Sequence, residues 1–377
     1  MMPIFFSGCR ARAALLVALA LAVPAPAADV KPPPLMNEAV LRVPKPGTFG
    51  VELETTVFRP DGDGPFPVAI INHGKASGDP LFQERARYTV AAREFVRRGY
   101  AVVVPMRQGF AGSGGRYVDG GCNIAGNARY QADDLEAAVG WLRKQPWADT
   151  TRMVVLGQSH GGLTTLAFGT RETSGVRALI NFAGGLRLKN CQWEDDLVSA
   201  FGTFGGRARV PSLWFYGEND SYFGPGLVSR MYDAYTKTGG KAKLVAYGPF
   251  KNDAHGMFGS RDGVSLWLPE VERFLQEAGL PTAVSVAVGE TPRPPASGFA
   301  AIDDAQAVPF VRDPGRKGYR LFLDRGVPRA FAVSPTGAWG WAYEGDDPAA
   351  RALASCQRNS KEPCRLYAVD DEVVWVR

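Results

Sequence analysis

The stretch Met153-Val154-Val155-Leu156-Gly157-Gln158-Ser159-His160-Gly161-Gly162-Leu163 places a serine between two glycines, in the pattern Gly-x-Ser-x-Gly. The apolar residues before this pattern predict a buried strand, and those after it predict a helix. A strand–turn–helix of this kind forms a nucleophile elbow, because the turn leaves no room for a Cβ at either glycine and holds the serine at a strained φ/ψ. We therefore expect Ser159 to be a nucleophile, and the backbone N–H of His160 to meet an oxyanion.

The surrounding chain alternates apolar strands with amphipathic helices. Strands are predicted at residues 51–58, 67–71, 100–105, 177–182, 210–216 and 242–247, and helices at 84–98, 133–144, 227–238 and 269–277. This alternation predicts an α/β fold with a doubly wound, mostly parallel sheet, in which binding and catalytic sites lie beyond the carboxyl ends of the strands.

Composition divides the 377 residues into five segments. Residues 1–28 combine two arginines, a short apolar run and Ala25-Pro26-Ala27, which predicts a signal peptide and a periplasmic or secreted protein with no membrane span after cleavage. Residues 29–46 are expected to be a proline-rich lead-in, residues 47–280 the main domain and residues 281–300 a linker. Residues 301–377 are expected to form a small α+β accessory module with a short helix after Asp347.

Four cysteines remain once the predicted signal is removed: Cys122, Cys191, Cys356 and Cys364. An even number in an exported chain predicts two disulfides. Proximity in the sequence favours Cys122–Cys191 and Cys356–Cys364, although two other pairings are possible. These cysteines lack the C-x-x-C spacing of a metal site, and we expect neither a metal nor a cofactor.

The chain has only three histidines, and each is followed by glycine at the end of a predicted strand. A serine hydroxyl needs a base to take its proton, and the base needs a carboxylate to orient it. His160 adjoins the serine, so its ring should point away from the hydroxyl, and His73 is expected to be a structural hydrogen-bonding group. His255, late in the chain, is therefore the predicted base.

The orienting acid is expected between Ser159 and His255 in the sequence. Asp220 follows the strand at residues 210–216 and is the predicted acid. Glu218 on the same turn is a competitor, whereas Asp253 is too near His255 in the chain to orient it easily.

Two further sets of residues complete the predicted site. A second oxyanion donor is expected from the backbone N–H of Gly74 or Lys75, with Lys75 favoured. Trp193, Tyr222 and Phe223 are candidates for a substrate pocket, although ordinary core packing explains such aromatic residues equally well. The Gly112–Gly115 run lacks the Lys-Ser/Thr ending of a phosphate-binding loop.

Taken together, these motifs resemble the α/β-hydrolase superfamily over about residues 50–280, and within it the dienelactone hydrolase-like and prolyl oligopeptidase-like serine hydrolases. The resemblance implies Ser159 as nucleophile, Asp220 as acid and His255 as base. Dienelactone hydrolases carry a cysteine nucleophile, so the serine favours ester substrates, and the chain has no room for the propeller of prolyl oligopeptidases. The motifs are Asn72-His73-Gly74, Arg107-Gln108-Gly109, Gly157 to Gly162, Gly217-Glu218-Asn219-Asp220 and Asp253-Ala254-His255-Gly256.

Three functions are compatible with this pattern. The first is an exported serine hydrolase that cleaves small carboxylic esters through an acyl-enzyme. The second is a peptidase or amidase with the same catalytic groups, and the third is a non-catalytic envelope binding protein. The net charge of +5 is spread without a long basic run, so no nucleic-acid partner is expected. The sequence does not indicate an oligomeric state.

Overall fold

The computed structural model describes Met1, residues 36–289 and residues 293–377. Apart from Met1, the predicted signal peptide lies outside the described residues, as does the first part of the predicted lead-in. Among the described residues, no helix has both the length and the apolar character needed to cross a bilayer.

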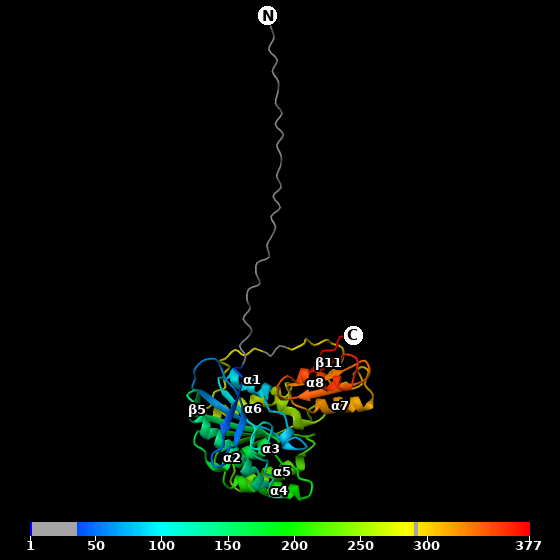
Figure 1. The fold of residues 1–377 in the computed structure, drawn as a ribbon. Coiled ribbons are helices and arrows are strands. Elements are labelled where there is room, and N and C mark those ends of the chain that lie inside the picture. The colour runs from blue at the N-terminus through cyan, green and yellow to red at the C-terminus, as the bar shows by residue number, and fades with distance from the viewer. Residues whose placement is uncertain (2–35, 290–292) are drawn as a thin grey trace. The chain divides into compact units, whose positions relative to one another are not determined.

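An eight-stranded sheet in the order β1-β2-β4-β3-β5-β6-β7-β8 organises the first part of the chain (Figure 1). Strands β1 and β2 are antiparallel to their neighbours, and the remaining strands are parallel. The predicted α/β class with a mostly parallel sheet is confirmed. The strands are β1 (Ala39–Pro44), β2 (Glu52–Phe58), β3 (Phe66–Asn72), β4 (Ala101–Pro105), β5 (Ala148–Gln158), β6 (Val176–Phe182), β7 (Ser212–Gly217) and β8 (Ala242–Tyr247).

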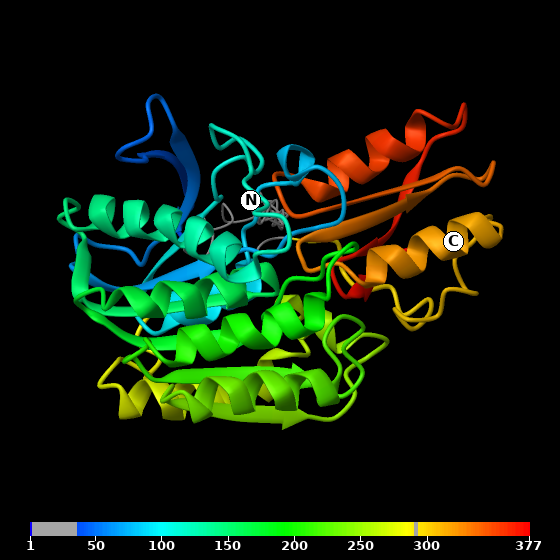
Figure 2. The same cartoon turned by 90° about the horizontal axis from the view of Figure 1, so that it is seen from below.

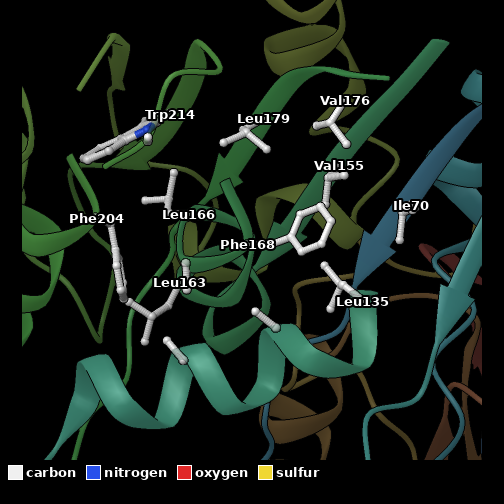
Figure 3. Packing of buried hydrophobic residues seen from close by; sticks show 14 of the residues in the cluster. Ile70, Leu135, Val155, Leu163, Leu166, Phe168, Val176, Leu179, Phe204 and Trp214 are labelled. Atoms are coloured by element: carbon white, nitrogen blue, oxygen red, sulfur yellow. The ribbon is translucent and has the colours of Figure 1, made fainter. Parts of the chain in front are cut away.

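Helices cover both faces of this sheet because the parallel strands are apolar on both sides. One buried cluster joins the sheet to α2 (Ile124–Leu142), α3 (His160–Phe168), α4 (Trp193–Gly205) and α5 (Pro225–Lys237). Figure 3 shows part of this cluster, with Leu163, Leu166 and Phe168 of α3 packed near Leu135 of α2 and Val155 of β5. A second cluster joins the opposite face to α1 (Thr89–Arg97) and α6 (Val264–Glu277).

The structure differs from the expected elements at several places. Helix α6 begins at Val264 rather than at residue 269, and α4 was not predicted. Three further differences lie in the first half of the chain. Residues 39–44, expected in the lead-in, form β1 and pair with β2. The helix expected at residues 84–98 begins only at Thr89, because Tyr88 adopts a left-handed conformation with φ 47°. Helix α2 starts nine residues earlier than the predicted start at residue 133, with the Asn123 side chain capping its first turn.

A second, four-stranded antiparallel sheet in the order β10-β9-β11-β12 follows near the C-terminus (Figure 2). The strand β10 is at one edge, and α7 and α8 pack against the sheet. Asp347 caps α8 as predicted, with its carboxylate accepting a hydrogen bond from the backbone N–H of Ala350 at 2.9 Å. The elements are α7 (Asp313–Leu323), β9 (Arg329–Val333), β10 (Trp339–Tyr343), α8 (Pro348–Gln357), β11 (Arg365–Val369) and β12 (Glu372–Val373).

Two disulfides are present, Cys122–Cys191 and Cys356–Cys364. These are the two pairings that proximity in the sequence favours. The first ties the loop before α2 to the loop before α4, and the second closes a short loop between α8 and β11.

Candidate active site

Ser159 occupies the sharp turn between β5 and α3, at φ 56° and ψ −125°. A Cβ added to Gly157 would lie 2.4 Å from the carbonyl oxygen of Gly161, and a Cβ added to Gly161 would lie 2.1 Å from that of Asn72. Any larger residue at either position would force the strand and helix apart. The sequence therefore adopts this strained turn because its glycines allow the two backbones to meet.

His255 and Asp220 form the next part of the arrangement. The Nδ1–H of His255 donates to the Asp220 carboxylate, at 3.0 Å from Oδ2 and 3.2 Å from Oδ1. Asp220 follows β7 and its side chain is fully buried, and Oδ1 also accepts from the backbone N–H groups of Tyr222 and Phe223. These contacts fix the carboxylate, which in turn leaves Nε2 of His255 as the ring nitrogen able to accept a proton.

Neither of the two competing acids, Glu218 and Asp253, is hydrogen-bonded to the His255 ring. Glu218 is exposed at the end of the same turn as Asp220. Asp253 shapes the loop that carries His255, because its carboxylate accepts from the backbone N–H of His255 at 2.9 Å and from the backbone N–H and hydroxyl of Ser221. Only Asp220 of these three side chains contacts the His255 ring.

The other two histidines are buried and neutral. Burial and the nearby Arg107 cation hold the pKa of His73 and of His160 well below the usual value. The His73 ring donates from Nδ1 to the carbonyl of Gly74, and the His160 ring donates from Nε2 to Asn127 Oδ1 at 2.7 Å. Both rings are engaged in structural hydrogen bonds, as expected for residues that support the site rather than transfer protons.

The three predicted oxyanion donors are not equivalent. The N–H of His160 is the first of helix α3, so no intrahelical carbonyl accepts it. The N–H of Gly74 donates to the Tyr88 hydroxyl at 3.1 Å and is therefore already engaged. Among the described residues, no hydrogen bond takes up the N–H of Lys75, which leaves Lys75 as the available donor on this loop.

Ser159, His255 and Lys75 line one cleft of about 420 Å³. In the described part of the chain, no hydrogen bond joins Ser159 Oγ to the His255 ring, and catalytic hydrogen bonds in ligand-free enzymes often tighten only when substrate binds. The side chain of Gln158 holds the two segments together by donating to the carbonyl of His255 at 2.7 Å. The Ser159 hydroxyl, the oriented His255 imidazole and Lys75 with its available backbone N–H thus line one cavity, an arrangement suited to acyl transfer.

The family model that matches this sequence is that of the X-Pro dipeptidyl-peptidase (S15 family), over residues 50–210. A curated relative, cocaine esterase from Rhodococcus sp. (strain MB1 Bresler), is 28% identical over 207 residues. The match spans 55% of this chain and only 32% of the esterase. With the strand order, the serine elbow and these matches, the resemblance to the superfamily is confirmed. The chain has the α/β-hydrolase fold.

Solved structures similar to this α/β hydrolase include a Mycobacterium tuberculosis puromycin-hydrolyzing peptidase, with 21% identity and a TM-score of 0.49 over 66% of this chain and 40% of that chain. The Pyrococcus furiosus esterase Pf2001 matches at 16% identity and a TM-score of 0.48, over 64% of this chain and 90% of that chain. The esterase relative and the peptidase family model support the prediction that the chain is a hydrolase.

Of the three aromatic residues predicted for a substrate pocket, only Tyr222 lines the cleft. Its ring lies 4.5 Å from that of His255, and the residue is 43% exposed. Phe223 is buried behind it, and Trp193 packs at the start of α4 against Phe223 and under the guanidinium of Arg187. Phe223 is therefore a core residue, and the half-buried Trp193 packs against the core; neither lines the cleft.

The cleft also has lining residues that no sequence motif indicates, and one group of them lies in the region of the small sheet. They come from the end of α7 and the loop after it, and from the end of β10. No motif marks them, so only the folded chain reveals their position. These residues are Leu321, Asp324, Arg325, Gly326, Tyr343 and Glu344.

Several contacts hold this region against the loops of the site. Arg85 pairs with Asp346 at 2.6 Å, and the Glu344 carboxylate accepts from the backbone N–H of Arg87 at 2.8 Å. On the other side, the N–H of Val327 donates to the carbonyl of Gly259, just beyond His255. The small sheet therefore supports both the segment before α1 and the histidine loop.

No group of three His, Cys, Asp or Glu side chains within residues 36–289 and 293–377 is arranged to hold a metal ion.

Proposed function

We propose that this α/β hydrolase cleaves small carboxylic esters through an acyl-enzyme. Ser159 Oγ attacks the ester carbonyl while Nε2 of His255 accepts its proton, and Asp220 stabilises the resulting imidazolium. The N–H groups of His160 and Lys75 stabilise the tetrahedral oxyanion. His255 then returns the proton to the departing alcohol, and water releases the acid from Ser159 by the same steps.

The observation that carries the proposal is the Asp220–His255 pair, which opens into the same cleft as the strained Ser159 elbow. A structural histidine needs no buried carboxylate that is itself fixed by two backbone N–H groups. The cleft volume of about 420 Å³ suits a small ester, and an esterase stands among the curated relatives.

The test uses p-nitrophenyl acetate and butyrate with the wild-type chain, Ser159→Ala and His255→Ala. Loss of either group is expected to lower kcat by up to about 10⁶-fold, since the groups act as one unit. A fluorophosphonate probe should label the wild-type protein and leave Ser159→Ala unlabelled. Normal ester turnover in Ser159→Ala would refute the proposal, and an unlabelled, inactive wild-type protein would favour a binding role.

Amide cleavage is the second candidate, favoured by the match to the S15 peptidase family over residues 50–210. Comparing p-nitrophenyl esters with p-nitroanilides of the same acyl group separates the two functions. An esterase is expected to turn over the ester far faster than the anilide. The amine of the anilide is a poor leaving group, and it departs slowly unless the enzyme assists it. Comparable rates on both substrates would assign the chain to the peptidases.

We also propose that the protein is exported, on the basis of the residue pattern at positions 1–28 and the two disulfides. Disulfides form and persist in oxidising compartments such as the periplasm. Fractionating cells that express the full chain should place the activity outside the cytoplasm. Activity confined to the cytoplasm, with the cysteines of both disulfides reduced, would contradict the proposal.

A further inference from the structure

Arg107, directly after β4 and Met106, is a buried arginine that reaches both segments carrying the proposed oxyanion donors. Arg107 is fully buried. Nη1 donates to the backbone carbonyl of His73 at 2.6 Å, and Nη2 donates to Nδ1 of the His160 ring at 3.1 Å. The backbone N–H of Arg107 also donates to Nε2 of His73 at 3.0 Å.

These contacts act on the two loops at short range. His73 stands two residues before Lys75, and His160 supplies the other donor from its own backbone. The His160 ring is held from its far side as well, because Nε2–H donates to Asn127 Oδ1. The side chain of Asn127 is fixed in turn by the carbonyls of Val118 and Asp119. One planar guanidinium thus spans the gap between the loop after β3 and the elbow.

The charge of Arg107 sets it apart from the other buried arginines. Arg98 pairs with Glu94 and Glu272, and Arg329 pairs with Asp371. Among the described residues, Arg107 has no carboxylate within ion-pairing distance, and its side-chain acceptors are a carbonyl and a neutral imidazole. Burial lowers the pKa of Arg107 to about 10, so it stays charged at neutral pH. A buried cation without an ion pair is costly, which argues for a role beyond packing.

We propose that Arg107 is a positioning residue that fixes the distance between the N–H groups of Lys75 and His160, and so builds the oxyanion hole. This inference rests on the proposed acyl-transfer function. The planar fork matters as much as the charge, because two acceptors in different segments must be held at once. If one N–H donor is displaced from the oxyanion, the enzyme binds the transition state less tightly, whereas its binding of the substrate changes little.

The experiment compares an ester with the matching thionoester in the full-length wild-type chain, Arg107→Met and Arg107→Lys. Sulfur is a weak hydrogen-bond acceptor, so a working oxyanion hole favours the oxygen ester. We expect Arg107→Met to lower kcat for the oxygen ester by about 10²-fold with little change in KM. The preference for the oxygen ester should fall at least tenfold in the same variant. Arg107→Lys should lose nearly as much, because one ammonium cannot hold both acceptors.

Arg98→Met is the matched control, since it removes another buried arginine that lies outside the cleft lining. It is expected to lower the melting temperature while leaving the oxygen-to-sulfur preference unchanged. If Arg107→Met does not fold, Arg107→Lys carries the test.

Three outcomes would overturn the inference. An unchanged oxygen-to-sulfur preference in folded Arg107 variants, with activity still lost in Ser159→Ala, would overturn this inference alone. Full turnover in Ser159→Ala would overturn the proposed function and this inference together. Complete recovery in Arg107→Lys would show that charge suffices, and that no fork holds the two loops.

Discussion

The two sheets of this hydrolase contribute to one cleft in different ways. The eight-stranded sheet supplies Ser159 after β5, Asp220 after β7 and His255 after β8, each beyond the carboxyl end of a parallel strand. The four-stranded sheet supplies a wall, including Arg325 and Tyr343, from loop and edge positions. Strand direction alone gathers the first set, whereas packing between distant segments places the second. The comparison predicts chemistry from the large sheet and substrate selection from the small one.

The largest expected effect tests the chemical half of this comparison. Asp220→Asn should lower kcat by about 10⁴-fold on p-nitrophenyl butyrate, because the amide no longer holds the His255 imidazole in the correct tautomer. Glu218→Gln on the same exposed turn should change kcat less than threefold. Steady-state kinetics on the folded variants measures both, and similar losses in the two would refute Asp220 as the orienting acid.

Tyr343→Ala tests the small sheet by the same assay. The Tyr343 ring supports the Arg325 guanidinium at 5.3 Å, and both residues line the cleft. We expect kcat on acetate to stay within about tenfold of the wild type, while the ratio of kcat/KM between long and short acyl esters changes by about tenfold. A 10⁴-fold loss of kcat would place the small sheet in the chemistry and end the division of roles.

The sequence predicted the parts of the fold and site that depend on local patterns. The Gly157–Gly161 turn and the apolar strands follow from steric and periodic rules that act within a few residues, whereas Asp220 and His255 were predicted by elimination and by their order after Ser159 in the chain. The delayed start of α1 was missed because Tyr88 is held by contacts with distant residues, among them the Gly74 N–H.

The cleft residues of the small sheet were not predicted from the sequence, for a related reason. Tyr343 and Arg325 have no motif, and the catalytic residues that share their cleft come from segments far away in the sequence, such as His255. The sequence left the roles of the aromatic residues open, since Trp193 and Phe223 look the same in the sequence whether they face core or cleft. The sequence shows which side chain is present, but only the packing of the folded chain shows whether that side chain faces the core or the cleft.

Stability should also differ between the two regions, through their disulfides. The Cys122–Cys191 bond spans 69 residues and the Cys356–Cys364 bond spans 8. Loop-closure entropy assigns about 4.4 kcal/mol to the first and about 2.5 kcal/mol to the second. Paired Cys→Ser variants unfolded in urea should therefore lose more stability for Cys122/Cys191. A larger loss for Cys356/Cys364 would show that the small sheet depends on its bond beyond chain entropy.

The smallest expected effect is on the pH dependence of stability, and it comes from Glu344 at the contact between the two regions. Burial raises the pKa of Glu344 to about 7, although its Oε2 accepts from the N–H of Arg87. The folded protein then binds a proton more tightly than the unfolded chain, so Glu344 lowers stability as the pH rises from about 4.5 to about 7 and adds no further change above that.

Glu344→Gln removes this ionisation while keeping the shape of the side chain. We expect the free energy of unfolding of the variant to fall less than that of the wild type between pH 5 and pH 8, as measured by urea denaturation at each pH. Asp313→Asn, an exposed carboxylate at the start of α7, should leave the wild-type pH dependence intact. Identical pH dependence in Glu344→Gln and the wild type would mean that Glu344 titrates as a solvated carboxylate, so that the contact between the two regions is open to water in solution.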